Sequence, residues 1–247
     1  MTDAVYVYGI VSADTAPPRD HAGIGDPPAK VQTLKSGDVA ALVSPIDART
    51  PLGRKEDLLA HQRLLDAVAA DGPVLPLTFG AALTDPDAVV GELLEPNRDD
   101  FVRALDELRG RAEYMVTARY VQEAVLGEVL DEHPELAELR DSIAGRPEEL
   151  THQDRIRLGE GINAAVSAKR EHDTRALADV VRPHVVQAVV REPAHELDAA
   201  RIAVLAEVDA EEKLTGSLAQ VARDWHGRAE IRVRGPLAPY DFVTTVR

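Results

Sequence analysis

The chain has 247 residues, which is enough for one large domain or for two modest domains that each bury a core without disulfides. It contains no cysteine, which excludes a disulfide scaffold, a thiolate nucleophile and a cysteine-ligated metal centre. Its 43 acidic and 28 basic residues give a net charge of −15, which disfavours nucleic acid or an anionic membrane surface as the main partner.

The first part of the chain predicts an antiparallel sheet. Residues 4–11 are β-branched, aromatic and apolar on both faces, as in a central strand. Residues 31–35 and 39–46 predict a hairpin in which Gly37 takes a positive φ. A further short strand is expected over residues 74–80.

Helices are expected after this hairpin and after the short strand. The first runs from Lys55 to Asp71, and its apolar positions are Leu58, Leu65, Val68 and Ala69. Asp85 before Pro86 begins a second helix, and a third stops at Gly110. We expect these helices to cover one face of the sheet in a modified ferredoxin-like arrangement.

The second part of the chain repeats this mixture of strands and helices. Strands are expected over 112–121, 200–208 and 230–234, and helices over 122–132, 134–145, 151–191 and 210–226. Pro183 should kink or end the long helix. The fold class is therefore α+β, with a ferredoxin-like N-terminal domain over residues 1–110. Residues 111–247 form an α+β C-terminal domain with long helices arranged as a helical hairpin.

No motif indicates catalysis or a bound metal. The eight histidines lack ligand spacing, no GxSxG element occurs, and the acidic pairs lie where helices or loops begin. The sequence therefore predicts no catalytic residue, no metal site and no cofactor. It also predicts that the largest pocket holds no hydrogen-bonded constellation of acidic or histidine side chains.

His61 is the single residue that stands out. It lies in the middle of the first helix, at the edge of the apolar face. A partly buried histidine that hydrogen-bonds to a neighbouring loop is favoured over a ligand or a proton-transfer group. The GIGD segment at residues 23–26 is interpreted as a loop that needs backbone freedom, since no helix follows it to form a phosphate site.

No stretch is apolar enough to span a bilayer, and the start of the chain lacks a basic leader, so a cytoplasmic location is expected.

Several segments together resemble the gas vesicle protein GvpF/GvpL family. They are VYVYGIV, the GIG loop, VAALVSPI, LLAHQRLLDAV followed by GPVLPLTFGAAL, RIAVLAEVDAEEKLTGSLAQVARDW and EIRVRGPLAPYDFV. Two motifs are the most specific as a pair, and their members are His61, Leu75, Pro76, Leu77, Phe79 and Gly80, and then Gly235, Pro236, Pro239, Tyr240 and Phe242. Leu237 departs from the family, which often has tryptophan there.

The resemblance implies a non-enzymatic accessory protein and minor component of gas vesicles. It implies binding to the hydrophobic shell protein GvpA, which limits aggregation of that protein while vesicles nucleate, and other accessory proteins are further candidate partners. The motif residues are expected to be structural. Strand addition at a sheet edge and an amphipathic helix in a groove remain alternative modes of binding.

Two other classes of function remain open. A regulatory module that binds a small ligand is the main alternative, and an enzyme with a pocket of convergent polar groups is the second.

Overall fold

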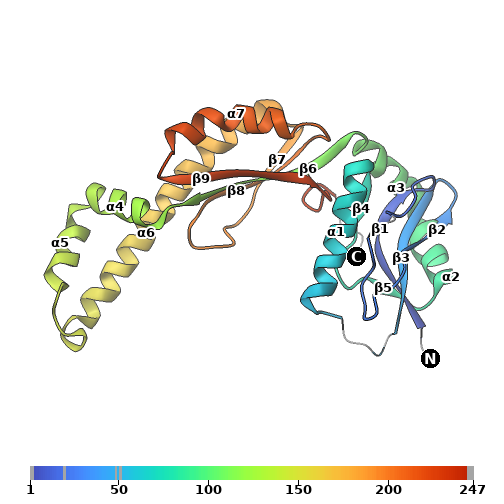
Figure 1. Cartoon of the computed structure of the whole chain (residues 1–247), viewed down its shortest axis with the longest axis horizontal. Coiled ribbons are helices and arrows are strands. Elements are labelled where there is room, and N and C mark those ends of the chain that lie inside the picture. The colour runs from blue at the N-terminus through green and yellow to red at the C-terminus, as the bar shows by residue number, and fades with distance from the viewer. Residues whose placement is uncertain (1–2, 19–20, 48, 50–51, 244–247) are drawn as a thin grey trace. The chain divides into compact units, whose positions relative to one another are not determined.

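The computed structural model describes residues 3–18, 21–47, 49 and 52–243 (Figure 1). The fold is α+β with two antiparallel sheets, as the sequence predicts. The chain divides into two compact units, described separately below. The first comprises Met1–Tyr114, Leu205–Glu211 and Arg234–Arg247, and the second comprises Met115–Val204 and Glu212–Val233. The expected division at residue 110 lies near the first crossing, but the two later segments of the first unit fall outside that contiguous scheme.

The first sheet has the order β2-β3-β1-β4, and β5 also pairs with β1. Its strands are β1 (Asp3–Ser12), β2 (Gln32–Ser36), β3 (Val39–Asp47), β4 (Val74–Pro76) and β5 (Ala82–Leu83). The hairpin between β2 and β3 turns at Gly37, whose φ of 59° matches the prediction.

Both faces of β1 are apolar, and a bulge within the strand determines which residues share a face. The register against β3 shifts between Val7 and Gly9, so side-chain alternation restarts after the bulge. Val7 and Ile10 therefore share one face, and Tyr8 and Val11 share the other. Each apolar face must therefore be packed against other elements of the fold.

Helices cover both faces of the first sheet, so the expectation of helices on a single face is wrong. Helix α1 (Lys55–Asp71) packs on the face of Tyr8. On the opposite face lies a continuous helical segment that begins with α2 (Pro86–Ala88), passes through a π-helical turn (Val89–Leu94) and ends with α3 (Glu95–Glu107). The physical reason is the double-sided burial of β1, which one layer of helices cannot provide.

The structure tests two predictions about helices in the first unit, namely the cap at Asp85 and the apolar face of α1. Asp85 accepts a hydrogen bond from the Ala88 N–H at 2.8 Å, which confirms the predicted cap. Leu65 and Val68 are buried as expected, but Leu58 is 40% exposed and is not part of the core.

The second sheet has the order β7-β8-β6-β9. Its strands are β6 (Arg111–Tyr120), β7 (Gln187–Val190), β8 (Asp198–Glu207) and β9 (Ala229–Leu237). The Tyr120 N–H donates to the Leu197 carbonyl and the Val121 N–H donates to the Arg228 carbonyl, so the end of β6 lies beside the starts of β8 and β9. These pairings are antiparallel.

Helices α4 (Gln122–Glu132), α5 (Pro134–Ile143), α6 (Glu148–Val181) and α7 (Glu211–Asp224) complete the second half of the chain. The long helix ends at Val181, just before Pro183, which confirms the expected effect of this proline; only the continuation predicted up to residue 191 is wrong. A short 3₁₀ turn follows at Arg182–His184, and residues 187–190 form β7. Pro183 removes a helical hydrogen bond, and the valine-rich run behind it favours a strand.

Among the residues that the structure describes, every helix is too short or too polar to traverse a lipid bilayer.

The buried face of α7 gives a direct test of packing in the second unit. Leu218 is 2% exposed, so Leu218→Ala should lower the free energy of unfolding by about 2–5 kcal/mol. Trp225 is the only tryptophan of the chain and follows α7, so its fluorescence during urea unfolding reports on this region. The exposed Thr215→Ala variant is the control, and equal stability of the two variants would show that the face is misassigned.

Candidate functional site

The candidate site is built around His61, which the sequence already singles out. His61 lies on α1 one turn from Leu64 and Leu65, on the face that packs against β1. It is 1% exposed, so it is fully buried and not partly buried as expected. The rings of Tyr6, Tyr8, Phe79 and Tyr240 surround it with centroids 5.6–6.5 Å away.

Both ring nitrogens of His61 have hydrogen-bond partners. Nδ1 lies 2.9 Å from the hydroxyl of Tyr6, and Nε2 lies 2.8 Å from the hydroxyl of Tyr240. The Tyr6 hydroxyl also accepts the Gly80 N–H at 3.1 Å. A neutral imidazole has one donor and one acceptor nitrogen, so two hydroxyl groups satisfy it completely. Besides a backbone hydrogen bond with Leu77 in the loop after β4, His61 is thus bonded to β1 and to the C-terminal segment.

Burial sets the protonation of this cluster. It lowers the pKa of His61 to about 4, and a backbone hydrogen bond with Leu77 offsets only part of the effect. Burial also raises the pKa values of Tyr6 and Tyr240 above the ordinary value for tyrosine. At neutral pH the cluster is therefore uncharged, and its hydrogen bonds hold segments together without supplying a poised acid or base.

The predicted motif after α1 places its residues on both sides of β1. Leu75, Pro76 and Leu77 are buried, and the Leu77 N–H donates to the Tyr8 carbonyl at 2.9 Å. Phe79 is half-buried, and its ring meets His61 edge-on. Gly80 has a φ of 98°, a conformation that favours glycine, and it turns its N–H toward Tyr6.

The C-terminal motif lies along the first unit. A Cβ on Gly235 would come within 2.3 Å of the Tyr114 ring, so glycine alone fits at this position. Pro236 is half-buried and Pro239 is buried. Phe242 packs against the core cluster on the α3 side of the sheet.

Two carboxylates anchor the segment that carries this motif. Asp66 of α1 accepts the Ala238 N–H at 2.9 Å, and burial raises the pKa of Asp66. Glu113 accepts the Asp241 N–H at 3.0 Å. With the bond between Tyr240 and His61, the two motifs are brought together at α1, 179 residues apart in sequence.

A second residue of α1, which holds the GIG loop, is not identified by sequence reasoning. Asp57 is 3% exposed, accepts the Gly25 N–H at 2.9 Å and pairs with Arg54, which lowers its pKa. The Ile24 N–H donates to the Tyr8 hydroxyl at 2.8 Å, and a Cβ on Gly23 would overlap that oxygen. The GIG loop is thus held against α1 and β1. The spacing of Asp57 and His61 at i and i+4 is the signal that both face the same layer.

A different polar cluster occupies the largest pocket described, an open hollow of about 560 Å³ in the second unit. Arg228 donates to Glu128 at 2.8 Å and to Asp173 at 2.7 Å, and its guanidinium stacks on the rings of Tyr120 and Trp225. Sequence reasoning predicts no acidic constellation in the largest pocket, and this prediction is wrong.

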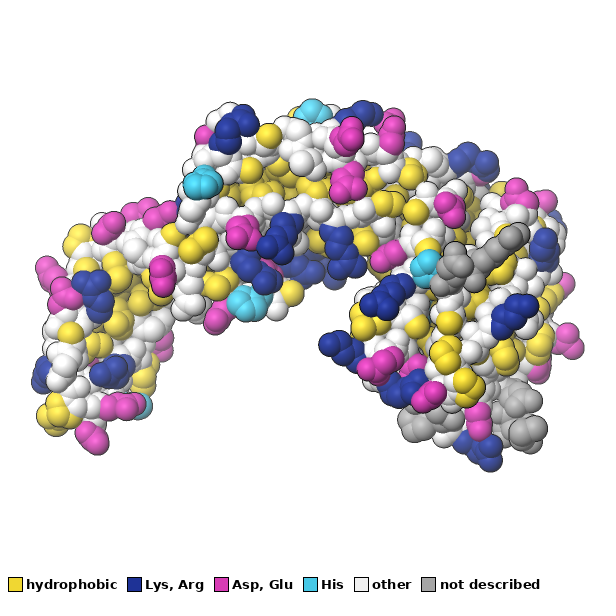
Figure 2. All heavy atoms as spheres, viewed as in Figure 1, with side chains coloured by type: hydrophobic (Ala, Val, Ile, Leu, Met, Phe, Trp, Pro, Cys, Tyr) yellow, Lys and Arg dark blue, Asp and Glu magenta, His cyan; other side chains and the backbone are white. Residues whose placement is uncertain are grey.

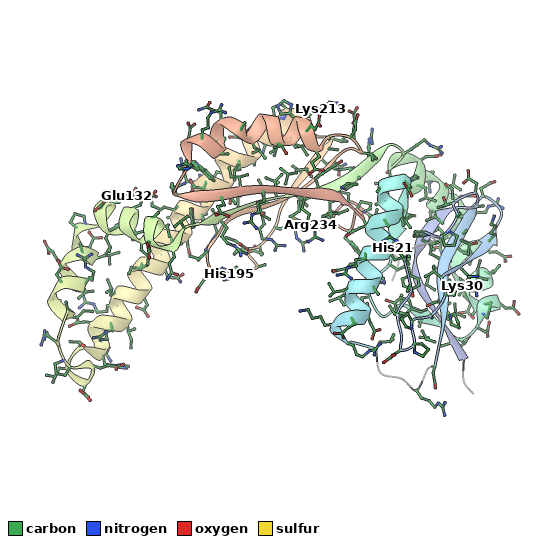
Figure 3. The ribbon with its side chains drawn as sticks, viewed as in Figure 1. His21, Lys30, Glu132, His195, Lys213 and Arg234 are labelled. Atoms are coloured by element: carbon green, nitrogen blue, oxygen red, sulfur yellow. The ribbon has the colours of Figure 1, made fainter. Side chains whose placement is uncertain are left out.

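Lysine and tyrosine complete the ion pairs of this cluster. Lys169 lies 3.1 Å from Glu128 and 2.7 Å from Glu132, which is labelled in Figure 3. The Tyr120 hydroxyl donates to Asp173 at 2.6 Å. Burial alone would raise the pKa of Glu128, but the hydrogen bonds from Arg228 and Lys169 outweigh it and lower that pKa. The cluster therefore ties α4, α6 and β6 to the turn before β9.

Neither cluster is arranged as a metal centre. Across the described residues, no group of three or more histidine, aspartate or glutamate side chains is placed to hold a metal ion.

Buried His61 makes stability depend on pH. Its pKa is about 4 when folded, against 6.5 ordinarily, so the unfolded chain binds more protons between these values. Stability is complete above pH 6.5 and falls as the pH drops toward 4. Between pH 7 and about 4.5, wild type should lose about 2–3 kcal/mol more than His61→Gln, measured by urea unfolding followed by circular dichroism. Equal losses in both proteins would contradict a buried, neutral His61.

The bond between the two motifs can be tested separately. Tyr240→Phe keeps the ring but removes the hydroxyl, which leaves Nε2 of the buried His61 without its partner. We expect a loss of about 1–3 kcal/mol in the free energy of unfolding. In the His61→Gln background the same substitution should cost less, and an unchanged cost would show that the two side chains are not coupled.

Comparison with known proteins identifies the family of this chain. Residues 4–244 match the family model of the gas vesicle synthesis protein GvpL/GvpF. Gas vesicle protein F of Streptomyces sp. (strain CB03234) is 35% identical over 97% of this chain and 99% of its own. Gas vesicle protein L of the same strain is 31% identical over 68% of this chain and 66% of its own.

Two solved structures share the fold. The crystal structure of GvpF from Anabaena sp. PCC7120 aligns with a TM-score of 0.76 at 23% identity, covering 99% of this chain and 100% of that one. The crystal structure of GvpF from Microcystis aeruginosa aligns with a TM-score of 0.72 at 22% identity, covering 97% and 98%. Since the family model spans nearly the whole sequence and a full-length relative is 35% identical, the chain belongs to the GvpL/GvpF family of gas vesicle synthesis proteins.

Proposed function

We propose that the protein is a non-enzymatic accessory and minor structural component of gas vesicles. In this role it binds the hydrophobic shell protein GvpA and limits aggregation of the shell protein while vesicles nucleate, and other accessory proteins are further candidate partners. It acts in the cytoplasm and at the vesicle, without nucleic acid or a membrane as partner. The observation that carries the proposal is membership of a gas vesicle synthesis family over nearly the full chain.

The charge of the chain suits this task. A shell subunit exposes apolar surface and strand edges before it assembles, and such surfaces aggregate. A partner with a net charge of −15 keeps a complex with such a subunit in solution, because like-charged complexes repel one another. Figure 2 shows the acidic side chains scattered between apolar patches on the face in view.

The pairing in the two polar clusters supports a structural role for the residues that form them. His61 has hydroxyl partners on both nitrogens, and Arg228 is paired with Glu128 and Asp173. A catalytic group needs a free position toward its substrate, and these groups spend their hydrogen bonds on neighbouring elements. The sheet order β2-β3-β1-β4 also supports the ferredoxin-like description of the N-terminal domain, with the first strand inside the sheet.

Light scattering tests the proposed function. Purified GvpA is diluted out of denaturant alone, with an equimolar amount of this protein, or with an unrelated acidic protein of similar charge. We expect this protein to suppress scattering and to elute with GvpA in size-exclusion chromatography. Suppression should persist at high salt, because salt screens charges beyond about 8–10 Å but does not weaken apolar contacts. Unchanged scattering with no complex at any salt concentration would refute the proposal.

A further inference from the structure

Strand β7 forms an unprotected edge of the second sheet. Within the part of the chain that the structure describes, β8 is its only neighbouring strand (Figure 1). All four of its residues are exposed, and three valines at this edge are 37–58% exposed, namely Val186, Val189 and Val190. The run from 185 to 190, VVQAVV, holds no charge in a chain where 29% of the residues are charged.

The opposite edge of the same sheet is built differently. On β9, the exposed positions Glu230 and Arg232 are charged. Charged side chains on an edge strand oppose pairing with another chain, and edge strands commonly carry them. One edge of this sheet is thus protected and the other is open, and this difference is what makes β7 a candidate binding edge.

The backbone of β7 directs two amides outward. The Arg191 N–H donates to the Arg201 carbonyl of β8 at 2.8 Å, so it points into the sheet. Amide directions alternate along a strand, so the N–H groups of Val189 and Gln187 also point toward β8. Those of Ala188 and Val190 point away from the sheet, where another extended backbone can accept them.

We propose that β7 binds an extended segment of the shell protein by strand addition. This inference rests on the proposed function, in which the shell protein is the partner. Val189 and Val190 lie on opposite faces of the strand, so the segment that fits is uncharged and apolar on both faces. Such a segment is the kind that aggregates when it lacks a partner.

The alternative occupants fit this edge less well. A helix has its own backbone groups paired internally, so it cannot accept the amides of Ala188 and Val190. A second copy of this chain carries the same net charge of −15, and that repulsion opposes association of identical chains. An uncharged strand of another protein meets neither obstacle.

Two substitutions separate backbone pairing from side-chain contact. Ala188→Pro removes an outward N–H and leaves the hydrogen bonds to β8 in place, and Val190→Lys puts a charge on the edge. Each should weaken capture of purified GvpA about tenfold, as measured by pull-down titration. Leu150→Lys is the matched control, because Leu150 is 69% exposed on α6, and it should bind as wild type does. Circular dichroism establishes that all variants are folded.

Hydrogen exchange gives an independent measurement. In the free protein, the amides of Ala188 and Val190 should exchange rapidly while that of Val189 is protected. GvpA should slow the exchange of the first two.

Each other result counts against the inference. Binding by wild type and by both β7 variants with equal affinity would overturn the role of β7 and leave the proposed function standing. Failure of wild type to bind GvpA would overturn both. A dimer of this protein alone that Val190→Lys dissociates would identify a second copy as the occupant and overturn the inference.

Discussion

Burial of both faces of β1 is the constraint on which the first unit depends. An apolar face on each side requires helices on each side, and α1 and α3 supply them. The same burial removes two tyrosine hydroxyls from water, and each then needs a partner. Tyr6 finds His61 and Gly80, and Tyr8 finds Ser44 and the GIG loop. Many of the segments that resemble the family contain the residues that cover β1 or hydrogen-bond to these two hydroxyls.

Polar groups in both units act as cross-links between elements that are distant in sequence. His61 joins α1 to β1 and to the C-terminal segment, and Arg228 joins α4 to α6. A buried group with every partner in place fixes one arrangement of the chain, because any other arrangement leaves a donor or a charge unpaired. These residues therefore contribute to the specificity of folding.

Local patterns predicted most elements but few of the contacts between them. The β-branched run of β1, the hairpin at Gly37 and helix α1 follow from the periods of two and 3.6 residues. The sequence singles out His61, and the family resemblance points to Tyr240. Their contact depends on how the chain returns to α1, which no local pattern records. The sequence alone does not single out Asp57 or Arg228 either, because buried and exposed charged residues cannot be distinguished until their partners are known.

The return of the C-terminal segment to the first unit has a consequence for how the protein is made. Leu205, Phe242 and Val243 pack against the same core cluster as the N-terminal strands. A chain grows from its N-terminus, and domains that are contiguous in sequence can fold while the ribosome is still working. Here Phe242 and Val243 are translated long after the N-terminal strands that they pack against, and the whole second unit lies between them in the sequence. The core of the first unit is therefore completed only after the second unit has left the ribosome, so the inserted unit can fold before the unit that contains it.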